Sequence, residues 1–318
     1  MSSKPSIIFM GTPDFALPSL ERLIQSGYSV PLVVTQPDRP SGRGQKLMSS
    51  AVKQLAIQHQ IPVYQPESFM RDPSPSERLK KISHDFLVVA AFGQILPPEV
   101  LGLAKIAPLN VHASLLPAYR GAAPIARAIM EGEQETGVTI QWMVEALDMG
   151  DILYQIPCKI EERDTSESLH DKLSQMGAQA LLHCLELFQK NNIHRKQQDA
   201  RVGSYALKLR KEERQIDFHQ PAVQLHRRIM GLNPWPMAEC QWMGQRLRII
   251  RSSFVARPSD AEPGTIVDVT PDQIVVACLD GCIGLLELQM ENKNRLLISE
   301  FLKAQPLRTG MILGGHRA

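Results

Sequence analysis

An amide and an imidazole lie two residues apart in the stretch Asn110-Val111-His112. Because side chains alternate across a β-strand, a strand here directs Asn110 and His112 to one face and Val111 to the other. A carboxamide can stabilise a developing oxyanion, and a neighbouring imidazole can move a proton. The same spacing is typical of a hydrogen-bonded core pair at a strand end, so the spacing leaves both interpretations open.

A carboxylate that could join this pair is Asp148, in the loop that follows a predicted strand over 137–144. A carboxylate beside an imidazole can orient the ring and stabilise its charged form. Asp and Gly also dominate turns, so Asp148 could be a turn residue without a chemical role. Asp151 competes for the same function, and sequence spacing does not choose between the two.

Other kinds of chemistry are not indicated. The turn after the first predicted strand, 11–15, lacks the Gly-x-Gly-x-x-Gly pattern of a dinucleotide site, and the chain contains no phosphate-binding loop or nucleophile elbow. The five Cys are an odd number, which argues against a disulfide framework. Cys278 and Cys282 have no matching His or Cys pair, so we expect no metal site.

These side chains require a scaffold, and the first half of the chain predicts one. Apolar runs rich in Ile and Val predict buried strands, and amphipathic stretches between them predict helices. The strands are expected at 6–10, 30–34, 86–92, 109–112 and 137–144, and the helices at 15–26, 50–60, 122–131 and 164–190. Alternating strands and helices predict an α/β fold with a mostly parallel sheet covered by helices on both faces, and such sheets bind ligands at the carboxyl ends of their strands.

The pattern of apolar and polar residues changes after the predicted helix over 164–190. Residues 191–207 are polar and lack periodicity, which predicts a linker between a domain over 1–190 and one over 208–318. The second domain is expected to hold a helix over 223–230 and a small β-barrel. Its strands are expected at 239–243, 247–255, 264–269, 273–279 and 282–288. Asp280-Gly281 between the last two predicts a type I′ hairpin turn.

Charge is unevenly distributed although the formal net charge is only +2. Residues 201–251 hold ten basic and four acidic side chains, and residues 39–53 hold four basic and no acidic ones. Clustered cations attract phosphate backbones, but a solvated surface is an equally ordinary explanation for such clusters. No signal peptide or membrane-spanning run is evident, so we expect a cytoplasmic protein that does not contact a membrane.

Several longer motifs carry a specific resemblance. The stretch 110–124 (NVHASLLPAYRGAAP), together with Leu147-Asp148-x-Gly-Asp151, resembles the signature of the folate-dependent formyltransferases. The stretches 9–15 (FMGTPDF), 35–46 (TQPDRPSGRGQK) and 233–236 (NPWP) are similar to the family branch that acts on methionyl-tRNA. The likeness runs from Ile7 to about Leu288.

This resemblance implies a Rossmann-like catalytic domain and an OB-like β-barrel that binds tRNA. It implies transfer of a formyl group from the co-substrate 10-formyltetrahydrofolate to the α-amino group of initiator methionyl-tRNA. We expect the protein to be a monomer and to use no metal. Asn110, His112 and Asp148 match the catalytic trio of the family. The folate-contacting loop is matched by Ser114, Leu115, Leu116 and Pro117, and the tRNA-contacting residues by Arg43, Lys46, Lys208, Arg210 and Lys211.

Two positions depart from the family pattern. Ala118 stands where relatives often have a basic residue, which puts a contact to a phosphate or a glutamyl tail in doubt. Met149 follows Asp148 where Thr is common, which changes the hydrogen bonding of the loop but leaves the carboxylate.

Three alternatives stay open at this stage. The acceptor could be another amine, such as glycinamide ribonucleotide or an amino sugar. The same trio could activate water, which would make the chain a formyltetrahydrofolate hydrolase. The chain could also be an RNA-binding module without catalytic activity, although the presence of all three trio residues argues against this.

Overall fold

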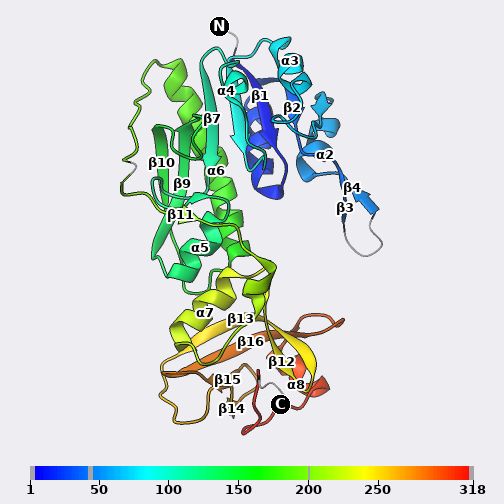
Figure 1. Ribbon diagram of the computed structural model, residues 1–318, viewed down its shortest axis with the longest axis vertical. Coiled ribbons are helices and arrows are strands. Elements are labelled where there is room, and N and C mark those ends of the chain that lie inside the picture. Colours follow the sequence, from blue (N-terminus) through cyan, green and yellow to red (C-terminus); the bar gives the residue numbers. More distant parts are fainter. Residues whose placement is uncertain (1–3, 42–45, 200, 315–318) are drawn as a thin grey trace. The chain divides into compact units, whose positions relative to one another are not determined.

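The structure is a computed structural model that describes residues 4–41, 46–199 and 201–314, with the side chains of residues 41–46 left undescribed (Figure 1). Arg43 and the side chain of Lys46, both predicted to contact tRNA, therefore lie outside the described residues. The chain divides into two compact units, each described by itself below. Unit 1 holds residues 1–121, 136–158 and 170–205, and unit 2 holds 122–135, 159–169 and 206–318.

A seven-stranded sheet forms the centre of unit 1 (Figure 1). Its spatial order is β10 (Ile152–Lys159), β9 (Glu135–Trp142), β7 (Ala107–His112), β6 (Phe86–Ala90), β1 (Ser6–Gly11), β2 (Ser29–Val34) and β5 (Val63–Tyr64). The five strands from β7 to β5 are parallel. β9 runs antiparallel to β7, so the sheet is mostly parallel, and the sequence pattern did not indicate which strand departs.

Helices cover both faces of this sheet, as the alternation of strands and helices predicted. On one face, Ile8, Met10 and Leu87 of the strands pack with Leu79 and Val100 of two helices in one buried cluster. The opposite face carries α6 (Ser166–Gln189), the longest helix of the described residues.

Two contacts place α6 on that opposite face. Gly177 of α6 leaves no room for a β-carbon beside Val111, and the ring of Phe188 lies 5.1 Å from that of Phe86. Because Val111 points away from Asn110 and His112, α6 supports the back of the strand that carries them.

Side chains cap the starts of two helices, α2 and α6. The side chain of Ser50 accepts a hydrogen bond from the backbone N–H of Lys53 and starts α2. Thr165 and Ser168 exchange side-chain and backbone hydrogen bonds of 3.0 and 3.2 Å at the start of α6, which is a capping box. The helices are α1 (Leu17–Gln25), α2 (Ala51–Gln58), α3 (Ser74–Lys80), α4 (Pro98–Leu101), α5 (Pro124–Glu131) and α6 (Ser166–Gln189), with a 3₁₀ turn η1 (Asp14–Ala16).

Two short pairs of strands lie outside the large sheet. β3 (Arg39–Ser41) pairs antiparallel with β4 (Lys46–Met48), and β8 (Arg120–Gly121) pairs with β11 (Tyr205–Ala206). The sequence predicted neither pair, and it also missed α3, α4 and β10. These elements are short, or lack the long periodic pattern on which such predictions depend.

An antiparallel sheet forms unit 2, and it is backed by α7 (Ala222–Gly231). Its order is β12 (Ala238–Trp242), β13 (Gln245–Val255), β16 (Cys282–Met290), β15 (Ile274–Ala277) and β14 (Ile266–Val269), with β17 (Leu296–Leu297) beside β16. A 3₁₀ turn η2 (Lys211–Arg214) precedes α7, and α8 (Ile298–Ala304) follows β17. Within the described part of the chain no pairing joins β12 to β14, so the ladder is open.

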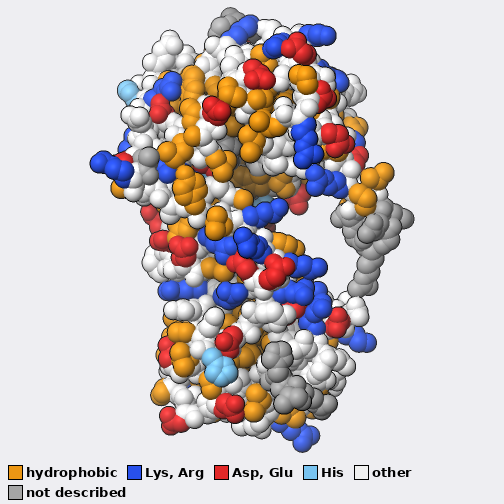
Figure 2. All heavy atoms as spheres, in the orientation of Figure 1, with side chains coloured by type: hydrophobic (Ala, Val, Ile, Leu, Met, Phe, Trp, Pro, Cys, Tyr) orange, Lys and Arg blue, Asp and Glu red, His pale blue; other side chains and the backbone are white. Residues whose placement is uncertain are grey.

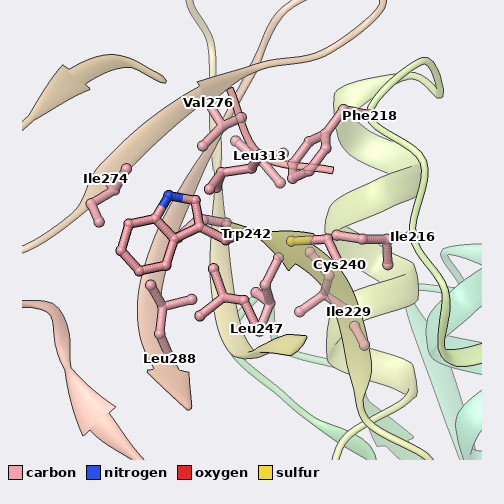
Figure 3. Close-up of a cluster of buried hydrophobic side chains, with 14 of the residues drawn as sticks. Ile216, Phe218, Ile229, Cys240, Trp242, Leu247, Ile274, Val276, Leu288 and Leu313 are labelled. Carbon is pink, nitrogen blue, oxygen red and sulfur yellow. The ribbon is translucent and has the colours of Figure 1, made fainter. Parts of the chain in front are cut away.

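The core of unit 2 is almost entirely apolar (Figure 3). Trp242, Leu247 and Leu288 from three strands point into one cluster, which Ile229 of α7 closes from the helix side. The fold class predicted from the sequence, a mostly parallel α/β sheet with a C-terminal β domain, is confirmed.

One turn of unit 2 differs from the expectation. The type I′ turn predicted at Asp280-Gly281 was wrong, because β15 and β16 are joined by four residues and Gly281 does not adopt a positive φ. A two-residue turn with positive φ at both positions does occur at Met243-Gly244, between β12 and β13, with φ of 50° and 74°. Met is an unusual residue in such a turn, which explains why the sequence did not indicate it.

No helix among the residues described here is long and apolar enough to span a membrane. In the same residues, no group of three or more His, Cys, Asp or Glu side chains could hold a metal ion.

Candidate active site on the β7 and β9 strands

Asn110 and His112 lie at the carboxyl end of β7, on the face opposite α6. The antiparallel pairing with β9 places Gln141 opposite Asn110 and Thr139 opposite His112. His112 is only 6% exposed, although it is a titratable side chain near the surface edge of a sheet. Polar groups of two neighbouring strands therefore meet on one face, at the edge where α/β sheets bind ligands.

The loop after β9 brings Asp148 to this pair. Oδ1 of Asp148 lies 3.4 Å from Nδ2 of Asn110 and 3.8 Å from Nδ1 of His112. The Asn110 contact is a long hydrogen bond, and the His112 contact has the length of an ion pair rather than of a hydrogen bond. The three side chains that the sequence singled out are thus adjacent. Asp151, the competing carboxylate, instead pairs with Arg195 at 2.8 Å.

Two further groups hold the Asp148 carboxylate. Nε2 of Gln141 donates to Oδ1 at 2.8 Å, and the backbone N–H of Gly121 donates to Oδ2 at 2.8 Å. Both contacts are shorter than those to Asn110 and His112, so they fix the carboxylate position. No sequence motif indicated Gln141, which is 2% exposed. A lone Gln in an apolar strand is a signal, but only the antiparallel register places it opposite Asn110.

The imidazole of His112 has its shortest contact elsewhere. Its Nε2 lies 3.0 Å from the backbone carbonyl of Tyr119. Because a carbonyl can only accept, this nitrogen carries the hydrogen, and Nδ1 is the ring nitrogen that faces Asp148. Tyr119 has a φ of 59°, an unusual value for a non-glycine residue that turns the loop back toward β7.

The predicted folate loop is anchored to β9 through Thr139. The Thr139 hydroxyl donates to the carbonyl of Ser114 at 2.6 Å and accepts from the N–H of Leu116 at 3.0 Å. The hydroxyl of Ser114 itself donates to the carbonyl of Ala118 at 2.6 Å. Ser114 and Leu116 are buried, whereas Leu115 and Pro117 are partly exposed.

The predicted tRNA-contacting residues of unit 2 lie on its surface. Lys208, Arg210 and Lys211 are all exposed, in the segment between β11 and α7. Figure 2 shows that Lys and Arg side chains gather over this segment, with Asp and Glu side chains among them.

The segment that carries these cations is anchored by an ion pair. The Arg127 guanidinium of α5 donates to both carboxylate oxygens of Glu213, at 2.6 and 2.9 Å. Hydrogen bonding from Arg127 lowers the pKa of Glu213, so the carboxylate stays charged in the folded protein.

Comparisons with known proteins agree over nearly the whole chain. Residues 4–185 match the family described as "Formyl transferase", and residues 208–306 match "Formyl transferase, C-terminal domain". The chain is 42% identical to the methionyl-tRNA formyltransferase of Clostridioides difficile (strain 630), over 97% of this chain and 99% of that protein. It is 44% identical to the methionyl-tRNA formyltransferase of Syntrophus aciditrophicus (strain SB), over 98% of this chain and 100% of that protein.

Solved structures share the fold at lower identity. WlaRD, a sugar 3N-formyl transferase, superposes with a TM-score of 0.68 at 19% identity and covers 92% of this chain and 100% of that one. HypX from Aquifex aeolicus, solved in complex with tetrahydrofolic acid, superposes with a TM-score of 0.63 at 16% identity and covers 99% of this chain and 51% of that one. The similarity to these distant enzymes is one of fold, whereas the similarity to the relatives of 42–44% identity extends through the sequence. The chain therefore belongs to the formyl transferase family, in the branch of the methionyl-tRNA formyltransferases.

Proposed function

We propose that this enzyme transfers the formyl group of 10-formyltetrahydrofolate to the α-amino group of initiator methionyl-tRNA, for translation initiation. The observation that carries the proposal is the convergence of Asn110, His112 and Asp148, with the two contacts to Asp148 at 3.4 and 3.8 Å. It occurs in a chain whose relatives of 42–44% identity over nearly their full length are methionyl-tRNA formyltransferases.

The reaction begins with attack of the unprotonated amine on the formyl carbon. A new C–N bond forms, and the carbonyl oxygen becomes negative in a tetrahedral intermediate. Asn110 supplies a carboxamide N–H to this oxygen, a type of contact whose removal costs ~10²–10³ in rate. Because Asp148 accepts from the same Nδ2 only at 3.4 Å, this amide is free to strengthen its contact to the developing charge.

Collapse of the intermediate breaks the bond between the formyl carbon and the folate nitrogen. The amine gives up a proton and the leaving folate nitrogen takes one up, so the exchange needs no covalent intermediate on the enzyme. The N–H at Nε2 of His112 donates to the backbone carbonyl of Tyr119, so Nδ1 is the ring nitrogen that can hold the oxyanion or relay the proton. The Asp148 carboxylate, 3.8 Å from Nδ1, stabilises the positive charge that the ring acquires.

The loop at 114–117 is proposed to contact the folate. Leu115 and Pro117 are partly exposed and can contact the ligand directly. Ser114 and Leu116 are buried, with 0% and 3% exposure, so they act by holding the loop in shape. The Ser114 hydroxyl donates to the backbone carbonyl of Ala118. This contact does not depend on the side chain at position 118, so the departure from the family pattern there does not affect it.

The tRNA is proposed to contact Lys208, Arg210 and Lys211, together with Arg43 and Lys46. The first three offer exposed cations on a segment that Arg127 fixes in place, which suits a phosphate backbone. We expect the enzyme to act as a monomer in the cytoplasm, where initiator tRNA is used.

The decisive experiment measures formyl transfer from labelled 10-formyltetrahydrofolate to charged initiator and elongator tRNAs side by side. The proposal predicts formylation of initiator methionyl-tRNA and formyl release that depends on this tRNA. Release without tRNA would identify a hydrolase, transfer to a different amine would identify another acceptor, and salt-sensitive RNA binding without transfer would identify a binding module.

The first variant for this assay is His112→Ala. General acid–base catalysis contributes about 10²–10⁴-fold, so kcat is expected to fall by that factor while tRNA affinity changes little. Single-turnover transfer and filter binding measure the two quantities. Turnover close to that of the parent would contradict the role assigned to His112.

A further inference from the structure

A segment of unit 1 that the sequence presented as an unpatterned linker contacts the loops on both sides of the candidate active site. We define this segment, residues 195–199 and 201–205 of the described chain, as the strap. Near its start, the backbones of Lys196 and Ile152 exchange hydrogen bonds of 2.8 and 2.9 Å. Near its end, Ser204 accepts from the N–H of Arg120 through its carbonyl, at 2.9 Å, and from the N–H of Tyr119 through its hydroxyl, at 2.9 Å.

Gln198 makes the central contact between the strap and the loop of Asp148. Its Nε2 donates to the backbone carbonyl of Asp148 at 2.8 Å and to that of Gly150 at 2.7 Å. The side chain is 8% exposed, so water competes little for these carbonyls. One amide thus holds two peptide units of this loop, the one that follows Asp148 and the one that follows Gly150.

The backbone of Asp148 needs such support. Its φ is 53°, in the left-handed region, where a residue with a β-carbon pays a steric cost of about 1–2 kcal/mol. A residue persists there only when its surroundings hold it. Gln198 holds the backbone of this residue, while Gln141 and Gly121 hold its carboxylate.

Arg120 fixes the orientation of the Gln198 amide. Its Nε and Nη2 donate to Oε1 of Gln198 at 3.1 and 2.9 Å. A guanidinium can only donate and a carbonyl can only accept, so the amide oxygen must face Arg120 and the amide nitrogen must face the loop. The hydrogen bonds to Arg120 therefore determine that the NH₂ group of Gln198 faces the carbonyls of Asp148 and Gly150.

Burial makes this contact to Arg120 important. Arg120 is 1% exposed, so its guanidinium has almost no access to water. The guanidinium also lies 3.5 Å from the carbonyl of Asp199 and 5.9 Å from the ring of Tyr205. A buried charge requires compensation, and Gln198 supplies the two shortest contacts that the structure records.

We propose that Gln198, oriented by Arg120, is a positioning residue for formyl transfer that acts through Asp148. It does not touch the reacting atoms. It keeps Asp148 in its left-handed conformation, with the carboxylate directed at Asn110 and His112. The inference rests on the proposed function, and it assigns a catalytic consequence to a segment outside the family signature on which that function was predicted.

The substitution Gln198→Glu separates positioning from packing. A carboxylate of nearly the same shape keeps an acceptor for Arg120 but has no hydrogen to donate to the two loop carbonyls. We expect kcat to fall about 10–100-fold, the usual effect of removing support from a reacting group, with the KM values for both substrates and the thermal stability largely kept. A kcat close to that of the parent would overturn the proposal.

Gln198→Met serves as a second variant because it removes the donors and also leaves Arg120 without its acceptor. Its stability should be lower than that of Gln198→Glu, whereas the loss of kcat in the folded fraction should be similar. If kcat follows stability across the two variants, Gln198 is a structural residue and the proposal fails. Asp199→Asn is the matched control, because it alters an exposed neighbour that pairs with Arg201 and should leave kcat unchanged.

A double-mutant cycle tests the route through Asp148. In an Asp148→Ala background, Gln198→Glu should lower the residual rate no further, because the group that it positions is absent. Full additivity of the two effects would show that Gln198 acts by another route and would overturn the proposal. The rate of the parent enzyme distinguishes a failure of the proposed function from a failure of this inference. A parent that does not formylate methionyl-tRNA refutes the proposed function. An active parent with an equally active Gln198→Glu variant refutes only the role of Gln198.

Discussion

The interior beside the candidate active site is polar, whereas the interior of unit 2 is apolar. Thr139, Gln141 and Gln198 are all less than a tenth exposed, and each has a side-chain hydrogen bond to a loop of the site. In unit 2, Trp242, Leu247 and their neighbours fill the core with side chains that carry almost no hydrogen-bonding groups (Figure 3).

The difference reflects two physical tasks. Hydrophobic contacts stabilise a fold without a strong preference for direction, so they can support a sheet that needs only to keep its shape. Hydrogen bonds are directional, so a network of them can define where a carboxylate points, at the cost of burying polar groups. The polar interior should therefore control rate, and the apolar interior should control stability.

The largest expected effect is that of Asp148→Ala on the rate. Loss of the carboxylate removes the charge opposite His112 and leaves Gln141 and the N–H of Gly121 without an acceptor. We expect kcat to fall about 10²–10⁴-fold, with little change in tRNA affinity. Rapid-quench formyl transfer measures this. A variant that kept parental turnover would remove the basis for assigning catalysis to the polar interior.

Next in size is Leu247→Ala, which tests the apolar interior. Leu247 is fully buried, and truncation of such a side chain costs about 2–5 kcal/mol in the free energy of unfolding. Urea unfolding followed by Trp fluorescence measures the loss, and Trp242 in the same cluster reports on it directly. Turnover per folded molecule should stay at the parental level. A large loss of turnover without a loss of stability would break the comparison.

A smaller effect is expected on the surface of unit 2. Replacing Lys208, Arg210 and Lys211 together by Ala should weaken tRNA binding and leave both interiors intact. Each phosphate contact contributes about one unit to the slope of log K against log salt, so the slope should fall by about three. Filter binding at several salt concentrations measures the slope. An unchanged slope would indicate that the tRNA contacts other cations.

The smallest effect concerns His226, one of the few titratable side chains inside unit 2. It is 6% exposed and its Nδ1 lies 2.9 Å from the hydroxyl of Ser252. Burial lowers the pKa of His226 below its ordinary value of 6.5. The imidazole therefore binds a proton more readily in the unfolded chain than in the folded one. Stability should therefore fall as the pH drops below about 6.5, until His226 is protonated in the folded state as well.

The substitution His226→Gln should reduce this pH dependence. Urea unfolding of the parent and the variant at pH 7.5 and 5.5 provides the test. If both lose the same stability on acidification, other groups cause the loss.

Sequence patterns predicted the elements that long periodic stretches specify. The buried strands that became β1, β2, β6 and β7 lie within two residues of the expected ranges, and α6 begins at the Asp164-Thr165-Ser166 cap. The antiparallel direction of β9 was missed, because alternation of apolar residues is the same in either direction. Gln141 and Gln198 were missed because neither belongs to a motif, and each contacts Asp148 only in the folded chain.

What the amino-acid sequence determined by itself was which side chains share a face. Strand alternation is a local property, and it put Asn110 and His112 together before any tertiary contact was known. Only the tertiary structure decided where Asp148 lies, because that position depends on the register of β9 against β7, on a left-handed backbone conformation and on donors from the strap. The strand register and the hydrogen bond from the strap join residues that are tens of positions apart in the sequence, so their geometry forms only when the whole domain folds.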